Sequence, residues 1–133
     1  MTKHKVSTLE GALLDAAVAK AEGWSLEVCD GEESWHDADE KPRKRPLPWS
    51  SMWEFGGPIS EREHLSPFWT GIGGDYEGWI CQASLPDVDH SGDPLWIYRI
   101  SRPRDNMLRG HTYLIAAMRA YVSSKFGDEV ELP

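Results

Sequence analysis

The chain has 133 residues, a length that allows one domain with a single hydrophobic core. Its 22 acidic and 14 basic side chains leave a net charge of −8, which argues against a general nucleic-acid binder, because such proteins bind phosphates with Lys and Arg. No apolar run is long enough to span a membrane, and the two cysteines, Cys29 and Cys81, make no disulfide framework. We expect one soluble, cytosolic domain over residues 1–133, with both cysteines as buried thiols.

The first predicted element is a helix over residues 8–22. Ser7 and Glu10 fit a capping box, with Ser7 as the N-cap and Glu10 three residues further on. Apolar residues then recur at helical spacing until Gly23 ends the helix. These residues are Leu9, Leu13, Leu14, Ala17, Val18 and Ala21.

The middle of the chain reads as several strands. Residues 24–29 and 78–85 have strand-like patterns, and residues 95–100 are the richest in β-branched and aromatic side chains. Residues 86–94 suit a hairpin loop between the last two strands, and residues 59–69 can hold one more.

Charged blocks fill residues 30–45, where six acids are followed by four bases. Such blocks usually form solvated loops, so we expect an exposed charged insert. His36 stands among these acids, but no cysteine or second histidine joins it at a zinc spacing. Residues 87–93 begin like a calcium loop, but Tyr98 occupies the position of the bidentate glutamate. No metal site is expected.

The second predicted helix follows Thr112, its N-cap, and ends at Gly127. Arg119 lies on its polar side, facing solvent, and residues 128–133 form an extended, solvated tail. The apolar stripe of this helix is Ile115, Met118, Val122 and Phe126. Together the elements predict an α+β fold with an N-terminal helix, a central antiparallel sheet of about three to five strands, and a C-terminal helix packed on that sheet.

Residues 8–23, 46–63 and 110–131 carry a family resemblance. The closing helix is its most specific part, and the middle motif, WEFGGPISERE at residues 53–63, comes next. Together the three stretches resemble the NinX-like proteins of tailed phages and prophages. The resemblance implies a phage or prophage accessory protein in the bacterial host cytoplasm, without an assigned biochemical activity. It implies no mechanism.

The middle motif is the best candidate for a binding site. Its Gly-Gly-Pro sequence predicts a turn, because the first glycine is free to take a positive φ and the second precedes proline. An aromatic wall beside free backbone N–H groups and an arginine could hold a planar, anionic ligand such as a nucleotide. The alternative is a structural turn whose aromatic side chains complete the core. The candidate ligand-binding residues are Trp49, Trp53, Phe55, Gly56, Gly57, Pro58, Glu61, Arg62 and Arg119.

No catalytic residue is assigned. The sequence has no serine elbow, phosphate-binding glycine loop or zinc-protease helix. His64 beside Glu61 and Glu63 offers an acid–base pair, but nothing places a substrate there. A small hydrolase of unrecognised type therefore stays a third hypothesis.

We expect a non-enzymatic binding module for a small, nucleotide-like ligand, with no cofactor and no membrane partner. The alternative is a factor that binds or inhibits a host protein through exposed aromatic and acidic surface. A homodimer that buries several of the seven tryptophans also stays open. The tryptophans are Trp24, Trp35, Trp49, Trp53, Trp69, Trp79 and Trp96.

We expect Gly57→Ala to perturb the fold or binding more than any single change in residues 30–45. A Cβ at a constrained glycine costs about 1–3 kcal/mol, whereas substitutions at solvated positions usually stay within about 0.5 kcal/mol. Melting temperatures of Gly57→Ala and of a variant with Glu32, Glu33 and Asp37 changed to Ser would check this. The motif has no special role if the glycine variant behaves like the parent while the acidic variant fails.

Overall fold

The computed structural model of the chain describes residues 2–71, 77–82 and 107–133. The expected strand at 95–100 and the expected hairpin loop at 86–94 lie outside these residues. The α+β class, with helices near both ends of the chain, is confirmed. No helix in the described ranges is long and apolar enough to cross a membrane.

Within the described residues, the strands form three antiparallel sheets, where one central sheet was expected. The first joins the two ends of the chain, with Thr2 opposite Leu132. The second has the order β2-β3-β4, and the third has the order β5-β6-β7. The strands are β1 (Thr2–Lys5), β2 (Ser25–Cys29), β3 (Glu32–His36), β4 (Pro42–Arg43), β5 (Phe68–Thr70), β6 (Gly78–Gln82), β7 (Met107–Gly110) and β8 (Glu129–Leu132).

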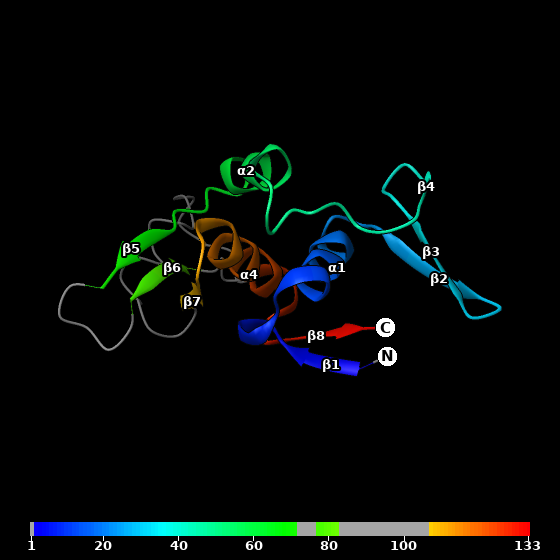
Figure 1. Cartoon of the computed structure of the whole chain (residues 1–133), viewed down its shortest axis with the longest axis horizontal. Coiled ribbons are helices and arrows are strands. Elements are labelled where there is room, and N and C mark those ends of the chain that lie inside the picture. Colours follow the sequence, from blue (N-terminus) through cyan, green and yellow to red (C-terminus); the bar gives the residue numbers. More distant parts are fainter. Residues whose placement is uncertain (1, 72–76, 83–106) are drawn as a thin grey trace, which may run out of the picture.

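The C-terminal helix α4 (Tyr113–Phe126) lies in the middle of the molecule (Figure 1). It packs against α1 (Gly11–Ala21), α2 (Trp53–Arg62), and strands β6, β7 and β8. The predicted N-cap is confirmed, because the side chain of Thr112 accepts a hydrogen bond from the Ile115 N–H at 3.1 Å. Burial extends beyond the expected apolar stripe to Ala116, Ala117 and Ala120, so this helix is covered on more than one side.

The capping box expected at Ser7 is wrong. Ser7 lies in a short 3-10 helix, η1 (Val6–Thr8), and the N-cap of α1 is Glu10, without a side-chain cap bond. Val6 and Leu9 are both buried, so the backbone turns the two side chains into the core before the α-helix begins. Gly11, with φ +58°, makes the turn into the helix, because a left-handed conformation suits glycine.

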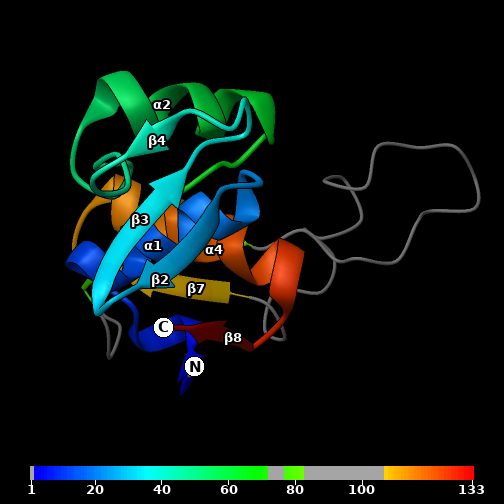
Figure 2. The same ribbon diagram turned by 90° about the vertical axis from the view of Figure 1, so that its right-hand side faces the viewer.

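Residues 30–45 are not simply a solvated loop. Their first part continues the hairpin from β2 into β3, through a tight turn at Asp30 and Gly31, which both have positive φ. Figure 1 shows this hairpin reaching away from the helices, and Figure 2 shows β2 and β3 side by side in front of α1. Trp35 is buried within it, so this position is an exception to the mild effects expected in the segment. The many charged residues of this segment gave no indication that Trp35 belongs to the core.

The tail over residues 128–133, for which an extended and solvated chain was expected, is only partly solvated. Residues 129–132 form β8, in which Val130 and Leu132 are buried and the intervening Glu131 is exposed. This alternation is the period-two pattern of a half-buried strand, and it is present in the sequence EVEL. The tail therefore completes the core beside β1.

The turn expected at Gly56-Gly57-Pro58 is wrong, and the strand expected in residues 59–69 begins only at Phe68. Residues 53–62 form α2, and neither Gly56 nor Gly57 has a positive φ. Pro58 lies inside this helix, where it lacks the N–H that would donate to the Glu54 carbonyl. The burial of Ile59 and Gly56 against the core favours the helix over the local turn signal.

Gly56 is a glycine because the chain passes too close to it for a side chain. A Cβ there would overlap the Trp49 carbonyl oxygen and lie 2.8 Å from Leu114 Cδ2. A Cβ on Gly57 would instead meet the ring of Trp53 at 3.0 Å, and this side chain needs to move by only a few tenths of an ångström, whereas Gly56 would require a backbone shift. The structure therefore places the strict requirement for glycine at Gly56, and the large effect expected of Gly57→Ala is revised accordingly.

Gly56→Ala should therefore destabilise the protein by about 3 kcal/mol, because the backbone of Trp49 must move to admit the methyl group. Gly57→Ala should change stability by less than about 1 kcal/mol, since alanine favours the helix and the ring can yield. Thermal unfolding of the two variants checks this. Equal melting temperatures for both variants would contradict it.

Candidate functional site

A groove of about 400 Å³ opens between α2 and the first turn of α4. We call it the aromatic groove, because two of its walls are aromatic rings. The residues that line it are Trp53, Gly57, Pro58, Ser60, Glu61, Leu65 and Tyr113. Its volume falls within the range of pockets that hold small molecules.

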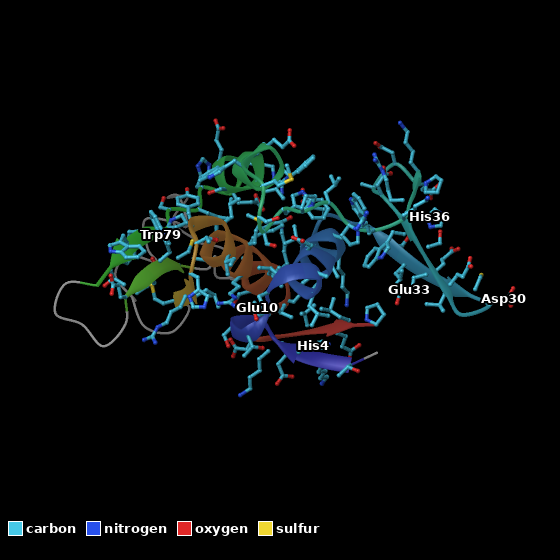
Figure 3. All side chains as sticks on the ribbon, in the orientation of Figure 1. His4, Glu10, Asp30, Glu33, His36 and Trp79 are labelled. Carbon is cyan, nitrogen blue, oxygen red and sulfur yellow. The ribbon has the colours of Figure 1, made fainter. Side chains whose placement is uncertain are left out.

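Four aromatic rings run in contact from the groove to the third sheet. The Trp53 ring lies 4.8 Å from that of Tyr113, which in turn lies 5.4 Å from Trp79. Trp79, labelled over β6 in Figure 3, meets Trp69 edge-on at 5.7 Å. Among the described residues the row begins at Trp53 and ends at Trp69, which are 58% and 53% exposed. Each exposed tryptophan therefore packs against one neighbouring ring of the row.

Polar atoms of the groove come from Ser60, Tyr113 and Glu61. Ser60 Oγ lies 3.4 Å from the Leu65 carbonyl oxygen, to which it donates, and 3.1 Å from Tyr113 Oη. The Glu61 side chain is exposed, and its carboxylate makes no hydrogen bond or ion pair with the residues that the structure describes. The groove therefore offers hydroxyl groups and one unpaired negative charge beside an aromatic face.

The structure brings together four of the nine residues that the sequence singled out, namely Trp53, Gly57, Pro58 and Glu61. Sequence reasoning missed Tyr113, Ser60 and Leu65. Ser60 lies inside the same motif and could have been included. Tyr113 comes from the far end of the chain, and only its aromatic character beside a helix N-cap hinted at a role.

Trp49, Phe55 and Gly56 support the groove from behind. Trp49 is buried and meets Trp24 edge-on, with ring centroids 5.2 Å apart. Phe55 packs against the core, and Gly56 lets α2 approach the Trp49 backbone. For these three residues the alternative of a structural motif describes the contacts better than direct contact with a ligand.

Arg62 forms a two-pronged ion pair with Glu22 at the end of α1. Its two terminal nitrogens donate to the two carboxylate oxygens at 3.0 and 2.8 Å, and Tyr121 Oη donates to Glu22 Oε2 at 2.6 Å. Burial opposes ionisation of Glu22, but hydrogen bonds from Arg62 and Tyr121, and the charges of Arg62 and Lys125, together hold its pKa below the ordinary value. This cluster, which we call the Glu22–Arg62 clamp, ties α1 to α2 and α4.

Arg119 does not face solvent, contrary to the expectation from the helix pattern. It is buried, and its guanidinium donates to the carbonyl oxygens of Leu9 and Arg109, both at 2.7 Å. A buried charge needs such partners, so Arg119 fastens α4 to the segment before α1 and to β7. It does not line the aromatic groove.

The remaining candidate groups are placed as follows. Cys81 is buried, as expected, and burial raises the pKa of its thiol to about 12. Cys29 is exposed on β2, so the expectation of a buried thiol is wrong at this position. His36 Nδ1 is buried without a hydrogen-bond partner among the described residues. Within the same residues, no three His, Cys, Asp or Glu side chains gather as a metal site would require.

Comparison with known proteins gives one family. The model of the family described as Bacteriophage P22, NinX matches residues 5–125, which is most of the chain. This range includes all three stretches that carry the resemblance, except the last few residues of the third stretch. No curated protein matches the chain.

The Glu22–Arg62 clamp predicts an acid-sensitive part of the stability. A carboxylate whose pKa is lowered on folding stabilises the protein above its unfolded pKa, near 4.5, and loses this effect as the pH falls through the folded value. Glu22→Gln should therefore lower the melting temperature by a few degrees at pH 7, about 1 kcal/mol, and by progressively less below pH 4.5.

Glu63→Gln is the matched control, because Glu63 approaches Arg62 and Lys125 only at 3.7 Å. It should change the melting temperature less at every pH. A Glu22→Gln variant that melts like the parent at pH 7 would show that the clamp contributes no stability.

Proposed function

The chain belongs to the NinX family of bacteriophage proteins, and on that premise we propose that this phage accessory protein is a binding module, which holds a small planar ligand in the aromatic groove. We propose further that it acts in the cytoplasm of the bacterial host. The activity we assign is binding without catalysis.

One observation carries the proposal: an aromatic side chain is exposed where it can stack on a flat ligand, and its neighbours hold it in place. Trp53 is more than half exposed, yet its ring packs against that of Tyr113 and lies against Gly57 of α2. A ring held in this way can stack on a ligand with little loss of conformational entropy. The absence of a side chain at Gly57 is what allows the indole to lie against α2.

Docking of a host protein is the second candidate, and the row of aromatic rings favours it. The exposed faces of Trp53 and Trp69 lie at opposite ends of the row, so a surface larger than one ligand carries tryptophan. Tryptophan is enriched among the residues that dominate the energy of protein interfaces. A partner protein would cover both ends, whereas a small ligand in the groove touches only Trp53.

Trp53→Ala should weaken binding of a planar ligand by about tenfold, because stacking of a base on an aromatic ring contributes about 1–3 kcal/mol. Fluorescence titration and thermal shift with a panel of nucleosides and nucleotides would measure this. Trp69→Ala is the matched control, since it also removes an exposed tryptophan but not from the groove. It should leave the affinity unchanged.

Two results would contradict the small-ligand proposal. One is that no member of the panel binds the parent protein, and the other is that both tryptophan variants bind equally well. A host protein that the parent retains and that both Trp53→Ala and Trp69→Ala release would favour the second candidate instead.

A further inference from the structure

The aromatic groove carries a negative charge and no positive one among its lining residues. Of the residues that line it, only Glu61 carries a charge, and this carboxylate has no partner in the described part of the chain. The other polar atoms at the groove are the hydroxyls of Ser60 and Tyr113, which can accept as well as donate hydrogen bonds. The groove is therefore richer in acceptors than in donors.

The neighbouring arginine does not neutralise Glu61. Arg62 directs its two terminal nitrogens to the Glu22 carboxylate and its Nε toward Glu63 at 3.7 Å. Consecutive residues on a helix point about 100° apart, so this clamp holds the guanidinium on a different face of α2 from the groove. Arg62, which the sequence motif suggests as a partner for a ligand phosphate, is therefore already bound to the Glu22 carboxylate.

Electrostatics then decides which planar ligand fits. A phosphate placed beside Glu61 would be repelled by it, and the net charge of −8 adds to the barrier for any anion. A flat group with N–H donors can instead stack on Trp53 and donate to the carboxylate, and a positive charge on that group strengthens both contacts.

We infer that the aromatic groove selects a planar group that carries N–H donors and no negative charge, such as an unphosphorylated nucleobase or a guanidinium ion. This inference rests on the proposed function, because it names the class of ligand for the same groove. Glu61 sets the charge preference, and Trp53 provides the stacking surface.

The experiment compares four probes, namely adenosine, adenosine 5′-monophosphate, cytidine and argininamide, in titrations that follow tryptophan fluorescence. Against the parent, at least one uncharged or cationic probe should bind, and adenosine should bind more tightly than its monophosphate by about threefold to tenfold, the effect of one charge a few ångströms away in a solvated groove. Glu61→Gln should remove most of this difference, and Glu61→Lys should reverse it. Glu27→Gln, which removes one exposed acid from β2, is the control for net charge and should change nothing.

The outcomes separate this inference from the function on which it rests. If Trp53→Ala weakens binding but the monophosphate binds the parent as well as adenosine does, the groove is the site and the inference is wrong. The inference is equally wrong if Glu61→Gln keeps the parent's preference. If no probe binds the parent, or Trp53→Ala binds every probe normally, both the function and the inference fail.

Discussion

The burial of α4 is the constraint on which the rest of the structure depends. Three alanines, Ala116, Ala117 and Ala120, are fully buried and let neighbouring elements approach the helix closely. At Gly110, on β7, a Cβ would lie 2.5 Å from the Ala116 nitrogen, so even one methyl group is too large at this contact. Arg119 then donates to backbone carbonyls on two sides of the helix. The small residues set the distances between α4 and its neighbours, and Arg119 fixes the orientation of the helix.

This arrangement explains how the aromatic groove comes to be where it is. Tyr113 is the first residue of α4, so its ring lies at the end of the buried helix, where Trp53 of α2 and Trp79 of β6 both contact it. The groove residues on α2 are brought to it by the close approach at Gly56 and by the Glu22–Arg62 clamp. In this motif, Gly56 and Arg62 therefore position α2, while Trp53 and Glu61 face the groove.

The sequence predicted those features that depend on local pattern. The cap at Thr112 was readable because one side chain and one N–H three residues away make it. The Gly-Gly-Pro motif misled for the opposite reason, since α2 packs at Gly56 against Leu114, which is distant in the chain. Likewise, no local signal joins Tyr113 to Trp53, so half of the aromatic wall was missed. The burial of Val130 and Leu132 could have been found, because their alternation with Glu129 and Glu131 was visible and was outweighed by the charge of the tail.

The pairing of β1 with β8 has a consequence for how the chain reaches its fold. Because Thr2 lies opposite Leu132, this two-stranded sheet closes a loop that contains nearly all of the chain, whereas the β2–β3 hairpin closes a turn of only a few residues. Loop-closure entropy rises with length, and non-local pairings are slow to form. During synthesis, β1 has no partner until residues 129–132 are made. This sheet therefore forms only after all the residues between its two strands have been made, and until then β1 is an unpaired strand that a chaperone or a neighbouring chain can bind.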